Sequence, residues 1–129
     1  MKRTVSFSKN SRNIFFHILT NCNLKCKHCY INKEQHGDTL LPLSVMETWL
    51  RSLCKQGDEA NIIFLGGEPT MHSECVSLMQ YAKDSGMETA LVTNGWRMSD
   101  NLRRELLRST WVRISLDSSN AEMYAAQRR

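Results

Sequence analysis

Short apolar runs alternate with amphipathic stretches along most of the chain, and this alternation is the strongest constraint on its fold. Runs with the composition of strands occur at 13–20, 62–65, 88–93 and 111–117. They are bounded by glycine, asparagine or aspartate, which favour turns at strand ends. Strict strand–helix alternation predicts an α/β fold in which right-handed crossovers join a parallel sheet.

The first predicted helix, at about 44–56, has signals at both ends. Ser44 and Glu47 have the spacing of a capping box, and Gly57 is a helix-ending residue. Its expected buried stripe consists of Val45, Trp49, Leu50 and Leu53.

Further helices are predicted at about 73–85, ending at Gly86, at about 99–108, and from near Asn120. The buried face of the helix at 73–85 should contain Cys75, Leu78, Met79 and Ala82.

Four chemically distinctive segments follow the predicted strands. The carboxyl ends of parallel strands share one edge of the sheet, so these segments should meet there. They are a cysteine-rich stretch after 13–20, the turn Gly66-Gly67-Glu68-Pro69, the turn Thr93-Asn94-Gly95, and the strand end Ser115-Leu116-Asp117.

Three cysteines, Cys22, Cys26 and Cys29, stand within eight residues in a C-x3-C-x2-C spacing. Clustered thiolates bind zinc or iron–sulfur clusters. A structural zinc site needs four ligands, and His28 is the nearby candidate for the fourth, although its place beside Cys29 makes joint chelation awkward. Three cysteines around a [4Fe–4S] cluster leave one iron free for another ligand.

These motifs together resemble the radical S-adenosylmethionine (radical SAM) enzymes. The resemblance rests on "CNLKCKHCY" after the first strand, "LGGEP" after the second, "VTNG" after the third and "ISLD" at the fourth, and it covers 13–128. It implies the first four β-α units of a partial (β/α)6 TIM-like barrel.

The resemblance also implies two cofactors, a [4Fe–4S] cluster and SAM. Cys22, Cys26 and Cys29 match the ligands of three irons, and SAM chelates the fourth. Gly66, Gly67 and Glu68 match the motif that contacts the SAM amino group. The other matches are His28, near the adenine, and Thr93, Asn94, Ser115 and Asp117, for the ribose and carboxylate.

The activity implied is reductive cleavage of SAM to a 5′-deoxyadenosyl radical that abstracts hydrogen from a substrate. The expected partners are an electron donor such as flavodoxin or ferredoxin and an unknown substrate. Peptide or protein maturation and cofactor biosynthesis fit the motifs best, whereas activation of a glycyl-radical enzyme and deazapurine formation stay open. No residue is assignable as a catalytic acid or base.

Two alternatives remain. One is a zinc-binding structural module that uses Cys22, Cys26, Cys29 and His28. The other is an inactive or partner-dependent remnant of a radical SAM enzyme.

The family usually has about six β-α units, but only four are visible here. We therefore expect 13–129 to be a truncated part of the core, with 111–117 as an exposed sheet edge that a partner chain could cover. Residues 1–12 are expected to be a flexible basic N-terminus.

Charge and composition bear on the expected partners and the expected location of the protein. The formal net charge is only +4, with basic residues concentrated at the ends, so we expect no nucleic-acid partner. No stretch is long and apolar enough to span a bilayer, and no signal peptide is recognisable. Five cysteines, an odd number, do not indicate a disulfide framework, and we expect a cytoplasmic location.

Overall fold

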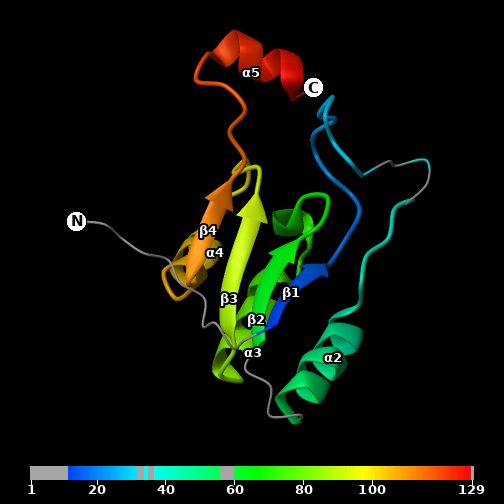
Figure 1. Cartoon of the computed structure of the whole chain (residues 1–129), viewed down its shortest axis with the longest axis vertical. Coiled ribbons are helices and arrows are strands. Elements are labelled where there is room, and N and C mark those ends of the chain that lie inside the picture. The colour runs from blue at the N-terminus through cyan, green and yellow to red at the C-terminus, as the bar shows by residue number, and fades with distance from the viewer. Residues whose placement is uncertain (1–11, 32–33, 35–36, 56–59, 129) are drawn as a thin grey trace.

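The computed structural model describes residues 12–31, 34, 37–55 and 60–128, and it contains the predicted parallel sheet (Figure 1). Its strands are β1 (Arg12–His17), β2 (Ala60–Leu65), β3 (Glu88–Thr93) and β4 (Trp111–Ile114), in the spatial order β1-β2-β3-β4. Each neighbouring pair is parallel. The α/β fold class predicted from the alternation is therefore confirmed.

Helices separate the strands as predicted. They are α2 (Leu43–Lys55), the 3-10 turn η1 (Pro69–Met71), α3 (Cys75–Asp84), α4 (Asp100–Leu106) and α5 (Ala121–Gln127). In Figure 1, α5 and the segment that follows β1 lie beyond the arrowheads of the strands, so both are at the carboxyl edge of the sheet.

The hydrophobic core lies between one face of the sheet and helices α2, α3 and α4. Alternate strand residues face it, as the two-residue period of a strand requires. The strands contribute Phe16, Ile62, Phe64 and Leu91, and the helices contribute Met46, Leu50, Leu78, Met79 and Leu102.

The prediction for α2 was wrong in detail. The helix begins at Leu43, so Ser44 lies inside the first turn rather than at the N-cap, and the carbonyl of Pro42 accepts hydrogen bonds from Val45 and Met46. Met46 and Leu50, one turn apart, are the buried pair.

Two members of the predicted α2 stripe are exposed. Val45 is 44% exposed and Trp49 is 59% exposed. Val45 and Trp49 each precede a buried residue along the helix, so their side chains are rotated away from the core. The Trp49 ring nevertheless stacks on the ring of Phe16, with 6.4 Å between the ring centres. The predicted helix stop, Gly57, lies outside the described residues.

The later helices agree better with the sequence. The four predicted residues of α3 are buried, and Gly86 after it has φ +85°, the left-handed conformation of a helix-ending glycine. Ser99 and Asn120 cap α4 and α5 by accepting backbone N–H bonds with their side chains.

Four strand boundaries differ from the prediction. β2 begins at Ala60, two residues before the predicted start at 62. β1 begins at Arg12, so that residue is not part of a separate N-terminal segment, and residues 1–11 lie outside the described part. β1 ends at His17; the N–H of Ile18 still donates to the carbonyl of Leu65 in β2, and Leu19 then bridges antiparallel to Leu40. β4 ends at Ile114, three residues before the predicted Asp117.

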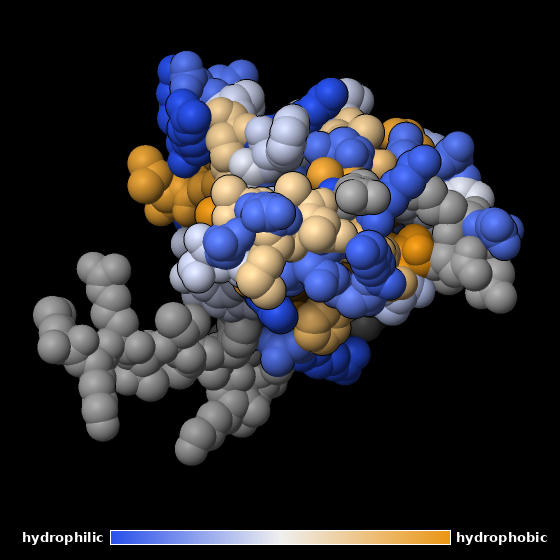
Figure 2. Space-filling view, turned by 90° about the horizontal axis from the view of Figure 1, so that it is seen from above, coloured by the Kyte–Doolittle hydropathy of each residue, from blue (hydrophilic) through white to orange (hydrophobic). Residues whose placement is uncertain are grey.

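β4 is an edge of the described sheet, as expected, and Ile114 on it is 56% exposed. No helix within the described ranges has the length and apolar character needed to cross a bilayer. Figure 2 looks at the molecule from above the view of Figure 1 and shows hydrophilic and hydrophobic residues intermixed on this side.

Candidate functional site

The three clustered cysteines lie on a loop, here called the cysteine loop (20–39), whose two ends are tied together. The backbone N–H of Thr20 donates to the carbonyl of Thr39 at 2.9 Å. The Thr20 hydroxyl accepts from the N–H of Thr39 and donates to the carbonyl of Gly37, at 2.8 and 2.6 Å. The two ends of this segment, at Thr20 and Thr39, therefore lie side by side just after β1.

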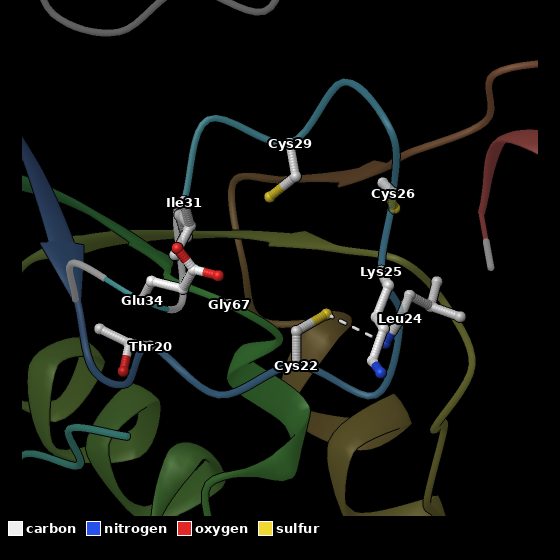
Figure 3. Close-up of a pocket in the computed structure, with 9 residues that line it drawn as sticks. All are labelled: Thr20, Cys22, Leu24, Lys25, Cys26, Cys29, Ile31, Glu34 and Gly67. Carbon is white, nitrogen blue, oxygen red and sulfur yellow. Dashed lines mark hydrogen bonds between the residues drawn. The ribbon is translucent and has the colours of Figure 1, made fainter. Parts of the chain in front are cut away.

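The sulfur atoms of Cys22, Cys26 and Cys29 surround a common space (Figure 3). This space is a cavity of 380 Å³ that Thr20, Ile31 and Gly67 also line. The N–H of Leu24 donates to the sulfur of Cys22 at 3.4 Å. Within the described ranges no three His, Cys, Asp or Glu side chains form a group that could hold one metal ion.

The turn after β2 lies against the start of the cysteine loop at backbone contact distance. Gly67 N–H donates to the Leu19 carbonyl, and Glu68 N–H donates to the Asn21 carbonyl, both at 2.9 Å. A Cβ on Gly67 would lie 2.0 Å from the Asn21 oxygen. Only glycine at position 67 therefore lets the turn after β2 lie this close to the cysteine loop.

Gly66 is constrained in a second way. Its φ of +148° is a conformation that other residues rarely adopt, and a Cβ there would lie 2.3 Å from the Leu19 oxygen. The glycines at this turn thus allow close approach of the Leu19 and Asn21 backbone, and their contact with SAM stays a prediction.

Glu68 is 1% exposed, and its carboxylate joins β2 to β3. Oε1 accepts from the hydroxyls of Thr70 and Thr93, both at 2.6 Å, and from Thr70 N–H at 3.2 Å. Oε2 accepts from Asn94 N–H at 2.7 Å. Most acceptor capacity is thus used within the protein, while Oε2 has one such bond and retains capacity for another donor.

Asn94 also reaches the cysteine loop. Its side-chain amide donates to Oδ1 of Asn23 at 2.8 Å. Asn23 was not among the residues predicted for the site, although it lies inside the cysteine motif. Thr93 and Asn94 therefore connect the end of β3 both to Glu68 and to the cysteine loop.

A second cavity, of 180 Å³, lies on the sheet side of the cysteines. Most of the residues predicted for the site line it together. These are Cys22, Cys26, His28, Cys29, Gly66, Gly67, Glu68, Thr93, Asn94 and Ser115. The prediction that four strand-following segments meet at one edge is confirmed for these residues.

Asp117 differs from that group, since it lines neither cavity. Its carboxylate instead accepts from the guanidinium of Arg128 and lies 3.5 Å from Nε2 of His28. The hydrogen bond from Arg128 is the main reason that the pKa of Asp117 is lowered. A direct contact of Asp117 with a cofactor stays a prediction.

Sequence reasoning missed Arg128, which lines the second cavity. It was grouped with the solvated charges near the end of the sequence, and no local motif distinguishes it from them. In the structure Arg128 is 8% exposed, and its guanidinium carbon lies 5.5 Å from the centre of the Tyr124 ring.

The donor set fits an iron–sulfur cluster. Three cysteine sulfurs stand around a volume, as the ligands of a cluster must because each binds a different iron. The N–H bond to the Cys22 sulfur is a contact of the kind that adjusts cluster potentials. The adjoining cavity leaves room for a ligand beside the cysteines.

Comparisons with known proteins agree with these motifs. The family model described as the Radical SAM superfamily matches residues 16–129. An S-adenosylmethionine-dependent nucleotide dehydratase from Flammeovirga pacifica is 32% identical over 94% of this chain and 43% of its own length. The Fe-coproporphyrin III synthase of Methanosarcina barkeri is 32% identical over 88% of this chain and 29% of its own length.

A solved structure supports the fold. The crystal structure of Streptococcus suis SuiB bound to its precursor peptide SuiA superposes with a TM-score of 0.79, at 21% identity, over 92% of this chain and 27% of that chain. This chain therefore spans less than half the length of each of these relatives.

Proposed function

Because this chain belongs to the radical SAM superfamily, we propose that its cysteine loop holds a [4Fe–4S] cluster and that the adjoining cavity binds SAM. The observation that carries the proposal is the cavity that Cys22, Cys26 and Cys29 share with Gly67 and Glu68. Bound together, the cluster and SAM supply reductive cleavage of SAM and hydrogen abstraction from a substrate.

The protein's own residues have distinct tasks in this proposal. Cys22, Cys26 and Cys29 provide the thiolates, and the N–H of Leu24 stabilises negative charge on the Cys22 sulfur. The free acceptor capacity of Glu68 Oε2 is suited to an ammonium group, such as the amino group of SAM.

Two of the remaining predicted residues line the second cavity, which supports a role for them in SAM binding. They are His28 and Ser115. Thr93 acts through Glu68, because its hydroxyl is directed to that carboxylate. No described side chain is proposed as a catalytic acid or base.

The substrate belongs to the peptide-maturation or cofactor-biosynthesis classes in our proposal. The SuiB neighbour is bound to a precursor peptide and the Methanosarcina relative is named as a porphyrin synthase. The Flammeovirga relative is named as a nucleotide dehydratase, a substrate class that sequence reasoning did not consider. A low-potential donor such as flavodoxin or ferredoxin supplies the electron.

The test is a SAM-cleavage assay under anaerobic conditions. The chain is reconstituted with iron and sulfide, reduced with dithionite and incubated with SAM, and 5′-deoxyadenosine is measured by mass spectrometry. We expect 5′-deoxyadenosine above that made by a Cys26→Ala variant. An iron-loaded chain that forms no more than this variant would favour the inactive-remnant alternative, and zinc without iron or sulfide would favour the zinc module.

A further inference from the structure

The end of α5 is attached to the cysteine loop by its backbone. The N–H of Lys27 donates to the carbonyl of Gln127 at 3.0 Å. Lys27 lies between Cys26 and Cys29, and α5 itself has no buried residue. This bond therefore joins two segments about a hundred residues apart at the point where the thiolates must be held.

A side-chain contact reinforces the same junction. Asp117, in the segment between β4 and α5, accepts from Nε of Arg128. The same Oδ2 atom lies 3.5 Å from Nε2 of His28, the neighbour of Lys27. One carboxylate thus faces both the end of α5 and the cysteine loop.

Arg128 is fixed by its surroundings. It is nearly buried, it packs over Tyr124, and it lines the cavity that contains the three cysteines. Burial alone would lower its pKa, but the hydrogen bond to Asp117 and the fields of Cys26 and Asp117 raise that pKa above its usual value. The guanidinium therefore stays charged throughout the physiological pH range.

We propose that Asp117 and Arg128 are positioning residues which, with the Lys27–Gln127 bond, hold the cysteine loop against α5 before any cluster is bound. We call these four residues the α5 clamp. This inference rests on the proposed function in one respect only, namely that the cysteine loop binds the iron–sulfur cluster. Its physical role is to restrict the loop in advance, so that less conformational entropy is lost when three thiolates bind iron.

The direct test is amide hydrogen exchange on the full chain without iron, resolved at Lys27 by NMR. Asp117→Asn and Arg128→Gln should speed exchange of the Lys27 amide by roughly 3- to 10-fold, the factor that accompanies loss of about one hydrogen bond. Arg128→Lys keeps the charge but not the guanidinium geometry, and should give an intermediate rate.

The matched controls are Asp100→Asn and Arg103→Gln. They remove an exposed Asp–Arg pair at 3.0 Å on α4, away from the loop. Both should leave Lys27 exchange within twofold of the unmodified chain. Amides of Ile63 and Leu91, in β2 and β3, report whether a variant has unfolded globally; if Arg128→Gln has, Arg128→Lys replaces it in the test.

Folded Asp117→Asn and Arg128 variants with unchanged Lys27 exchange would overturn the clamp. A second readout is the rate at which a chelator removes iron after reconstitution, which should rise in the same variants and not in the controls. An unmodified chain that takes up no iron contradicts the proposed function but leaves the exchange result intact. Normal iron uptake with unchanged Lys27 exchange contradicts the clamp alone.

Discussion

The hydroxyl of Thr93, at the end of β3, donates a 2.6 Å hydrogen bond to Oε1 of Glu68, in the turn after β2. Both groups are buried, and the next residue, Asn94, donates its N–H to the other carboxylate oxygen. Residues that the motifs suggested as separate cofactor contacts are therefore one hydrogen-bonded unit across neighbouring strands.

Replacing Glu68 with alanine should have two effects. Removal of a carboxylate that accepts from Thr70, Thr93 and Asn94 should lower the free energy of unfolding by about 1–3 kcal/mol, measured by urea denaturation. Loss of a charge-assisted bond to the SAM ammonium should also weaken SAM binding by about one to two decades in iron-loaded protein.

Glu74→Ala is the matched control, because that glutamate makes no capping hydrogen bond at α3. It should leave SAM affinity unchanged. If Glu68→Ala is destabilised but binds SAM with normal affinity, the carboxylate holds the two strand ends together and does not contact the cofactor.

Much of this edge was predictable from the sequence, because parallel strands bring their carboxyl ends together whatever the details of packing. The alternation located the strands, and the motifs located Cys22, Gly67 and Glu68 at their ends. The direction of each side chain was not predictable. The hydroxyl of Thr93 faces Glu68 only because β2 and β3 have the register that pairs Phe64 with Leu91.

Gly66→Ala should strongly destabilise the chain. The new Cβ would lie 2.3 Å from the backbone oxygen of Leu19, and the alanine would have to adopt the φ of +148° that Gly66 has. Together these should cost about 3 kcal/mol or more in unfolding free energy. Thermal or urea denaturation of the iron-free chain provides the measurement.

Gly86→Ala is the control variant, because it introduces an alanine at positive φ without a steric clash. Gly86 also has positive φ, but a Cβ there meets nothing within 4 Å. Its cost should be about 1–2 kcal/mol, that of a left-handed alanine. Equal losses in the two variants would show that the contact between Gly66 and Leu19 is unimportant.

Cys75 should be the least reactive described cysteine. Burial, followed by the charge of Glu68, raises the pKa of its thiol to about 12 from 9.0. Because the folded-state pKa is raised, the neutral thiol's contribution to stability is complete below about pH 9 and is lost as pH rises from about 9 to about 12.

Alkylation with iodoacetamide, followed by mass spectrometry, checks this prediction. At pH 8.5 Cys75 should stay unmodified in the folded chain and react once the chain is unfolded in guanidinium chloride. Rapid labelling of Cys75 under native conditions would contradict the burial of this residue at the start of α3.

The part of the site that sequence reasoning missed depends on contacts distant in the chain. Asp117 was read as a strand-end cofactor contact, but β4 ends at Ile114 and the carboxylate meets Arg128. Nothing in the local sequence distinguishes Arg128 from a solvated arginine. Only the placement of α5 beside the cysteine loop buries it.

Single cysteine substitutions should divide into two classes. Cys22→Ala, Cys26→Ala or Cys29→Ala should each remove most of the iron, because water replaces a thiolate ligand poorly. Cys54→Ala should retain near-normal iron, since that thiol lies on α2 and its neighbour in the structure is the carbonyl of Ser85, at 3.7 Å. Iron analysis after anaerobic reconstitution distinguishes the classes, and loss of iron from Cys54→Ala with retention in Cys26→Ala would reverse the assignment.

In our proposal the cysteine loop holds a cluster with one iron open to SAM. Anaerobic reconstitution with iron and sulfide, followed by chemical analysis and by electron paramagnetic resonance of the dithionite-reduced chain with and without SAM, examines both parts of this proposal at once. We expect about four irons and four sulfides per chain and a spectrum that changes when SAM is added. Zinc alone, or a cluster whose spectrum SAM does not alter, would contradict it.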